Sequence, residues 1–249
     1  MRTVVALLVC LTLASCTTGA DGSDQETLTV LAAASLTESF TELEQEFEAD
    51  LGSVDVRLAF DSSATLAQQV IEGAPADVLA TADERTMRTA VDADVVDGSP
   101  EIFATNELVL VVPAENPAGI EQFTDLDDPD VDYVACAESA PCGAAARTLL
   151  EASRIGSEPK SLEVDVKAVL SKVALDEADA GLVYATDAVA AGDRVKAISV
   201  PQSDTAVNRY PIAVPTGSGH PELAEEWIEF VLSDRGQALL GDNGFGSPG

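Results

Sequence analysis

The sequence predicts an α/β protein of two lobes, each a mostly parallel sheet flanked by helices. Short apolar segments rich in valine, leucine and isoleucine alternate with longer segments in which apolar residues recur every three or four positions. The first pattern is typical of buried strands and the second of amphipathic helices, and their alternation is typical of βαβ units. The alternation continues along most of the 249 residues, a length that suits two lobes of ordinary size.

The first half of the chain is expected to open with a buried strand at residues 27–33, TLTVLAA. A helix is expected from Ser35 onward, because four apolar residues spaced by four, three and four positions form one stripe: Leu36, Phe40, Leu43 and Phe47. The other elements expected in this half are a strand at 54–60, a helix at 63–73, a short strand at 76–83, a helix at 84–96 and a strand at 107–113.

The second half repeats the alternation. Its expected strands are 131–137, 161–166, 180–185, 195–200 and 209–215, and its expected helices are 142–153, 167–178, 186–192, 221–234 and 235–244. We expect the strands at 107–113 and 209–215 to cross between the lobes and to act as a hinge. On this interpretation one lobe comprises residues 27–107 plus 214–249, and the other comprises 108–213.

The N-terminal segment is typical of an export signal. Residues 1–15 contain a basic Arg2 and then an apolar run that is too short to remain as a membrane anchor. The segment ends in LASC, which resembles a bacterial lipobox and predicts lipidation of Cys16; the alternative is an ordinary signal peptide cut nearby. Residues 16–26 are small, polar and aperiodic, which indicates a flexible tether on the extracytoplasmic face.

The charge composition is strongly acidic. With 44 acidic and 13 basic residues, the formal charge is −31. Nucleic acid is therefore not an expected partner, because neutralising phosphates requires a basic surface, and the same argument excludes a broad contact with anionic lipid. A small anionic ligand is still compatible with this composition, because backbone N–H groups at helix N-termini can bind it locally.

The cysteines and the single histidine exclude several kinds of site. Cys10 leaves with the signal segment, so Cys136 and Cys142 remain in CAESAPC; an exported chain favours a disulfide between them, and two free thiols are the alternative. A cysteine-rich metal site is poorly supported. A serine hydrolase would need His220 as its base, yet the sequence has no GxSxG motif, so His220 is expected to be a loop residue and the protein is not expected to be an enzyme.

Several predicted helices begin directly after a strand with small or polar residues. Ser35 starts SLTE, which fits a capping box with Glu38, while Ser62 and Ser63 precede the next helix. The segments APCGAA and VDVKAV start two helices in the second half. Each such start leaves backbone N–H groups without partners, and such turns converge at the carboxyl edge of an α/β sheet. Serine hydroxyls and helix-end amides together suit an oxyanion that keeps its charge.

Three segments carry a family resemblance: TVLAAASLTESF, FDSSATLAQQVIEGAPADVLATAD and GLVYATDAVA. Together they resemble the molybdate-binding receptors of bacterial ABC importers, and the resemblance covers nearly the whole chain after the tether. It implies a two-lobed periplasmic-binding-protein fold (type II) that closes around molybdate or tungstate. It also implies the donors to the anion, namely the hydroxyls of Ser35, Ser63 and Tyr184 and the backbone amides of Ser35, Cys142 and Val166.

The resemblance implies a receptor that needs no cofactor and hands its ligand to a transporter permease. Molybdenum would be held only as an oxyanion, without direct metal ligands, by a monomer attached to the membrane through its lipid alone. Asp61 departs from the family pattern, because a small residue is common there, so we expect its carboxylate to point away from the anion or to be paired. The alternative is a receptor for sulfate or phosphate. Tyr184 taken alone could instead be a core tyrosine with a satisfied hydroxyl.

Overall fold

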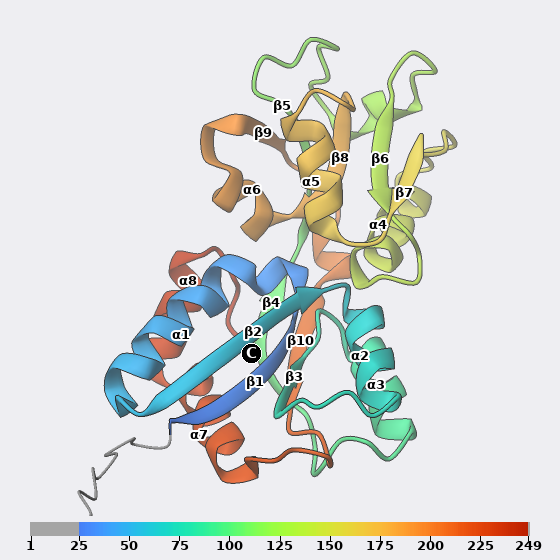
Figure 1. Cartoon of the computed structure of the whole chain (residues 1–249). Helices are drawn as coiled ribbons and strands as arrows, with labels where there is room; N and C mark the ends of the chain where they lie inside the picture. Colours follow the sequence, from blue (N-terminus) through green and yellow to red (C-terminus); the bar gives the residue numbers. More distant parts are fainter. Residues whose placement is uncertain (1–24, 249) are drawn as a thin grey trace, which may run out of the picture.

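The computed structural model describes residues 25–248, which form two α/β lobes, one above the other in Figure 1. The predicted signal segment, Cys16 and nearly all of the tether lie outside these residues. Within the part that the structure describes, no helix is both long and apolar enough to cross a membrane.

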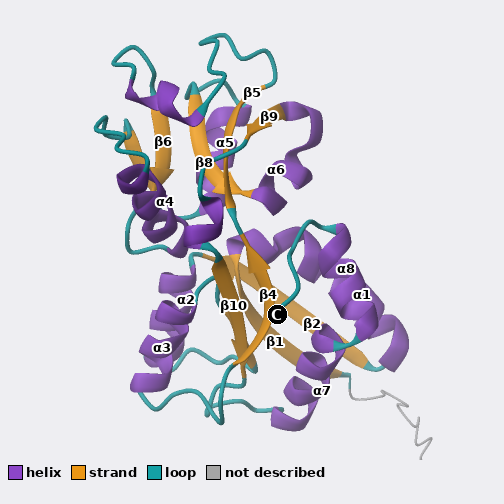
Figure 2. Cartoon of the chain, turned by 180° about the vertical axis from the view of Figure 1, so that it is seen from behind, coloured by secondary structure: helices purple, strands orange, loops and turns teal. Residues whose placement is uncertain are grey.

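The first lobe is built on a five-stranded sheet with the strand order β2-β1-β3-β10-β4. Its strands are β1 (Glu26–Ala33), β2 (Val54–Asp61), β3 (Val78–Ala80), β4 (Glu101–Asn106) and β10 (Asn208–Ala213). One face is covered by α1 (Thr37–Leu51), α7 (Pro221–Leu232) and α8 (Asp234–Asp242), and the other by α2 (Ser63–Ile71) and α3 (Glu84–Asp92), as Figure 2 shows.

The second lobe has the same plan, with the strand order β7-β6-β8-β5-β9. Its strands are β5 (Leu108–Pro113), β6 (Tyr133–Cys136), β7 (Ser161–Glu163), β8 (Ala180–Tyr184) and β9 (Val195–Ile198). Its α-helices are α4 (Pro141–Ala152), α5 (Val166–Ala174) and α6 (Ala185–Ala191). Residues 25–248 also contain four short 3-10 helices: η1 (Ala34–Leu36), η2 (Phe123–Asp127), η3 (Gly192–Arg194) and η4 (Ser203–Ala206).

The apolar stripe expected on the first helix forms the centre of the first lobe. All four stripe residues are buried, and Phe40 and Phe47 both pack edge-to-face on Trp227 of α7, with ring centroids 5.8 and 5.2 Å apart. Aromatic pairs in this geometry add stabilisation beyond their buried area. The packing fixes α1 against the sheet and so fixes the position of its N-terminal end, which lies at the carboxyl end of β1.

Each sheet is mixed: four of its five strands run in the same direction, as expected of a mostly parallel sheet, and one strand, β10 or β5, runs against them. In each sheet two neighbouring pairs are parallel and two are antiparallel. The antiparallel pairs all involve β10 or β5, which enter their sheets after the chain has crossed from the other lobe. A strand that enters its sheet by such a crossing is not the second strand of a βαβ unit, so it need not run parallel to its neighbours.

The structure also corrects the expected crossing points. β10 pairs with β3 and β4 in the first sheet, so the chain returns to the first lobe before residue 208, not after residue 213. β4, which contains the segment EIFATN, is a strand that the sequence analysis does not predict. The first crossing lies between β4 and β5, as expected.

Candidate functional site

A small cavity lies where the two lobes meet. The centre of a water molecule could occupy about 20 Å³ of it. Its walls come from the first residues of helices and from the strand ends before them, in both lobes. All five candidates that the resemblance implied are brought together here: Ser35, Ser63, Cys142, Val166 and Tyr184. The remaining lining residues are Ala33, Ala34, Ser62, Ala82, Ala140, Pro141 and Asp165.

Ser35 does not cap a helix, so the capping-box expectation is wrong. It lies within the 3-10 helix η1, and the helix α1 begins only at Thr37, without a side-chain cap. The Ser35 hydroxyl instead lies 2.9 Å from the hydroxyl of Tyr210 on β10, and both residues are buried. A tertiary partner has replaced the local one, which leaves Ser35 at the cavity wall.

Ser63 is the first residue of α2, and its hydroxyl oxygen accepts the backbone N–H of Ala82 at 2.9 Å. Because that oxygen already accepts a bond from the protein, the hydroxyl proton is left to be donated. Asp61 does not line the cavity, and its carboxylate accepts the N–H of Ser62 at 2.6 Å. The expectation that Asp61 is paired or turned away is therefore confirmed.

The second lobe presents backbone amides to the cavity. Pro141 is the first residue of α4 and has no N–H, so the first amide of this helix belongs to Cys142. Val166 is the first residue of α5, and the carboxylate of Asp165 caps that helix by accepting the N–H of Ala168 at 2.8 Å. The amides of Cys142 and Val166 both stand at helix positions that have no partner within the helix.

The predicted disulfide between Cys136 and Cys142 is present. It ties the end of β6 to the start of α4, and the turn between them is tightly packed. A Cβ atom on Gly143 would lie only 2.0 Å from the carbonyl oxygen of Ala137, so this position requires glycine. The turn that carries the Cys142 amide is therefore held both by a covalent bond and by close backbone packing.

Tyr184 is completely buried at the end of β8, yet its hydroxyl has no hydrogen-bond partner among the described residues. Burial is the main reason why the pKa of this hydroxyl lies well above its usual value. The group is therefore a neutral O–H donor at physiological pH. An unpartnered buried hydroxyl costs about 1–3 kcal/mol, so its presence at the cavity wall points to a ligand that accepts its proton.

Three charged residues connect the lobes beside the cavity, and of these only Glu38 was expected to make a contact, with Ser35. Lys167, the second residue of α5, lies 2.6 Å from the carboxylate of Glu38 on α1 and 3.0 Å from that of Asp187 on α6. Glu38 therefore does not reach back to Ser35 but pairs with the opposite lobe. No local sequence pattern identifies this cluster, because its members come from three separate helices.

Asp187 gives a prediction about stability and pH. Burial raises its pKa to about 6, although the charge of Lys167 opposes the shift. Because the folded pKa lies above the unfolded value of 3.8, the protonated form favours folding, and this contribution is lost as the pH rises through 6. We expect the free energy of unfolding of the wild type, minus that of Asp187→Asn, to fall by up to about 3 kcal/mol between pH 4 and pH 7. Chemical denaturation of both proteins at each pH measures this difference. A difference that stays constant or grows over this range would contradict the assignment.

Comparison with known proteins agrees with this geometry. The family described as bacterial extracellular solute-binding protein matches residues 28–246. The molybdate-binding protein ModA of Mycobacterium tuberculosis (strain ATCC 25618 / H37Rv) is 40% identical over 221 residues, which cover 89% of this chain and 85% of that protein. YvgL of Bacillus subtilis (strain 168), whose name describes an ABC transporter substrate-binding lipoprotein, is 30% identical to this chain. The alignment covers 97% of this chain and 96% of YvgL.

Among solved structures, the periplasmic molybdate-binding protein of Azotobacter vinelandii has a TM-score of 0.79 at 19% identity, covering 89% of this chain and 100% of that one. This likeness shows the two-lobed fold. The match along residues 28–246 and the 40% identity to a relative show the family as well. The chain belongs to the bacterial extracellular solute-binding proteins.

Proposed function

We propose that this protein is an extracytoplasmic receptor that binds molybdate or tungstate between its lobes and delivers it to an ABC importer. Its curated relatives include the molybdate-binding ModA of Mycobacterium tuberculosis, and its family binds solutes. The five residues assigned to the anion are those that line the cavity: Ser35, Ser63, Cys142, Val166 and Tyr184. On this proposal the protein catalyses no reaction.

One observation carries the proposal: residues with hydrogen-bond donors, from both lobes, line one cavity. The carboxylates nearest to this cavity form hydrogen bonds with backbone N–H groups. Asp61 and Asp165 each accept a backbone N–H through Oδ1, and of the two only Asp165 lines the cavity. A buried dianion requires several charge-assisted hydrogen bonds, which hydroxyls and amides supply. Such a set of donors favours an oxyanion without protons.

The alternative ligands differ in how well this cavity suits them. Hydrogen phosphate needs an acceptor for its proton. Asp61 lies outside the cavity wall, and Asp165, the carboxylate that does line it, uses its Oδ1 atom to cap α5. Sulfate carries no proton and could use the same donors, so it would be distinguished from molybdate only by its smaller size.

We also propose that the mature protein is a monomer anchored by a lipid on Cys16. The LASC segment supports this proposal, and so does the lipoprotein description of the relative YvgL. Metabolic labelling with a fatty acid, compared between the wild type and Cys16→Ala, tests the anchor directly.

Isothermal titration tests the ligand. The chain from Thr17 onward, which contains every described residue, would be titrated with molybdate, tungstate, sulfate and phosphate at moderate salt. Tight one-to-one binding of molybdate and tungstate, with little heat from the other two anions, is the expected result. Binding of sulfate or phosphate alone would overturn the ligand assignment. If none of the four anions gave binding heat, the proposal of an oxyanion receptor would lose its support.

The contact between the lobes through Glu38 gives a further prediction. The carboxylate of Glu38 is 44% exposed, and such a partly solvated pair contributes about 0.2–1 kcal/mol. If the pair helps the lobes to close, Glu38→Gln should weaken molybdate binding up to about 5-fold at low salt. The loss should disappear at 1 M salt, where exposed charges are screened. A loss of the same size at both salt concentrations would show that the charge pair is not its cause.

A further inference from the structure

Two buried asparagines face each other where the chain crosses between the lobes. Asn106 is the last residue of β4 and Asn208 is the first residue of β10, and they are partners in the antiparallel register of these strands. Neither residue lines the cavity. Each begins a chain of hydrogen bonds that ends on one of the two candidate serines.

The first chain runs from Asn106 to Ser35, and its proton order can be derived. The Oδ1 atom of Asn106 accepts the backbone N–H of Glu107 at 3.0 Å, so the other side-chain atom is the NH₂ group. This group donates to Thr186 Oγ1 at 2.9 Å and, more weakly, to the Tyr210 hydroxyl at 3.5 Å. The oxygen of Tyr210 is therefore an acceptor toward Asn106.

The proton of Tyr210 then has Ser35 as its acceptor. The two hydroxyl oxygens lie 2.9 Å apart, and either could donate on distance alone. If Ser35 donated, two donors would point at the oxygen of Tyr210, and the Tyr210 proton could turn only toward the neighbouring hydroxyl of Tyr184, with which it forms no hydrogen bond within 3.5 Å. With Tyr210 as the donor, the Tyr210 proton has an acceptor and the Asn106 amide keeps its own, and the proton of Ser35 remains for the cavity.

The second chain runs from Asn208 to Ser63. The side-chain amide of Asn208 donates to the backbone carbonyl of Ala82 at 2.9 Å. The backbone N–H of Ala82 in turn donates to Ser63 Oγ at 2.9 Å. A backbone N–H can only donate, so the oxygen of Ser63 is occupied as an acceptor. Both serines therefore face the cavity with a proton to give, and the strands at the lobe crossing hold both of them in that state.

We propose that Tyr210, supported by Asn106, is a specificity-determining positioning residue: it keeps Ser35 a donor and so makes the site reject oxyanions that carry a proton. The inference rests on the proposed function and deepens it. Without the Tyr210 hydroxyl, the oxygen of Ser35 has no donor from this side, so both of its lone pairs can accept from a ligand. A protonated anion such as hydrogen phosphate could then donate to it, whereas molybdate could not make use of it.

The test is competition of phosphate against molybdate at pH 8, in the wild type and in Tyr210→Phe. Molybdate binding by the variant should weaken about 2- to 10-fold, because one neutral hydrogen bond that orders the donor is lost. Phosphate binding should strengthen, so that the ratio of the two dissociation constants changes at least about 5-fold in favour of phosphate. Failure of the wild type to bind molybdate would instead overturn the proposed function itself.

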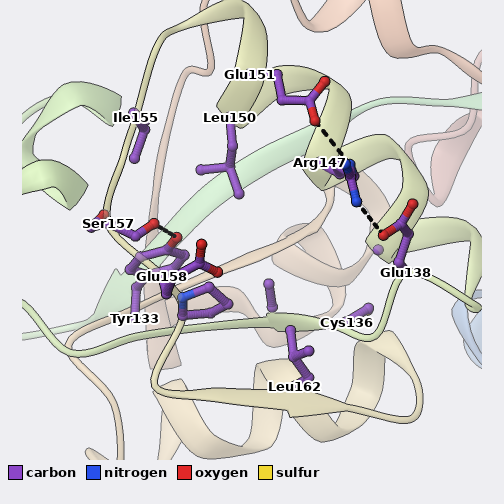
Figure 3. A pocket seen from close by; sticks show the side chains of 13 residues that line it. Tyr133, Cys136, Glu138, Arg147, Leu150, Glu151, Ile155, Ser157, Glu158 and Leu162 are labelled. Atoms are coloured by element: carbon purple, nitrogen blue, oxygen red, sulfur yellow. Dashed lines mark hydrogen bonds and ion pairs between the residues drawn. The ribbon is translucent and has the colours of Figure 1, made fainter.

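Tyr133→Phe is the matched control. Tyr133 is as buried as Tyr210, and its hydroxyl donates to the carbonyl of Ser157 at 2.7 Å (Figure 3). Tyr133 does not line the cavity between the lobes. This variant should lower the melting temperature and leave the ratio unchanged. A Tyr210→Phe variant that weakens both anions equally, or that excludes phosphate as fully as the wild type does, would overturn the proposal, because Tyr210 would then be only structural.

Discussion

Tyr184→Phe is expected to weaken molybdate binding about 10- to 150-fold while leaving the unliganded protein as stable as the wild type or more stable. The loss of affinity follows from removing one hydrogen bond to a charged ligand, which is worth about 1.5–3 kcal/mol. The free energy of unfolding is not reduced, because the Tyr184 hydroxyl is completely buried and has no hydrogen-bond partner among the described residues. Removing an unsatisfied buried hydroxyl removes its desolvation penalty.

Titration calorimetry and thermal unfolding of the same preparations would measure both effects. Tyr133→Phe is again the control, because its hydroxyl is satisfied by Ser157. That variant should lose stability and keep its affinity for molybdate, the reverse of the pattern expected for Tyr184→Phe. A Tyr184→Phe protein that is clearly destabilised, or that binds molybdate normally, would show that Tyr184 is a core residue and not an anion ligand.

Ser63→Ala is expected to lower molybdate affinity by a similar factor, about 10- to 150-fold, and also to reduce stability. The first effect is the loss of a hydroxyl donor in the cavity. The second arises because the N–H of Ala82 donates to the Ser63 oxygen and would be left without that partner in a buried position. Stability measured by chemical denaturation should fall by about 1–3 kcal/mol.

Ser62→Ala provides the comparison, because Ser62 is also buried and also lines the cavity. Ser62 is the N-cap of α2, but its side chain makes no capping hydrogen bond. Its replacement should change neither the affinity nor the stability by much. Equal losses in the two variants would mean that the anion uses both serines, or that the turn responds to any substitution.

Much of the fold could be predicted because its signals are local. The stripe of Leu36, Phe40, Leu43 and Phe47 identifies α1 and is buried as expected. The pairing of β10 and β5 with their neighbours was not predicted, because strand order depends on contacts between segments about 100 residues apart. β4 was missed although three of its six residues are buried, because EIFATN is short and only partly apolar.

The candidate site was found for a different reason. Small residues at helix starts indicated where an anion could bind, but only the family resemblance selected Ser63 over Ser62 and raised Tyr184 above an ordinary core tyrosine. The capping box at Ser35 shows the limit of local reasoning, since the pattern fits and yet Tyr210, 175 positions away, is the actual partner. Asn106 and Lys167 act through similar distant contacts, which no local pattern in the sequence predicts.

The most direct test of the central claim is a crystal structure of the protein grown with molybdate, with anomalous diffraction recorded at the molybdenum absorption edge. The account predicts one strong anomalous peak between the lobes, with oxygen atoms within hydrogen-bond distance of the hydroxyls of Ser35, Ser63 and Tyr184 and of the amides of Cys142 and Val166. A peak at another place, or none at saturating molybdate, would contradict the assignment of this cavity as the molybdate site.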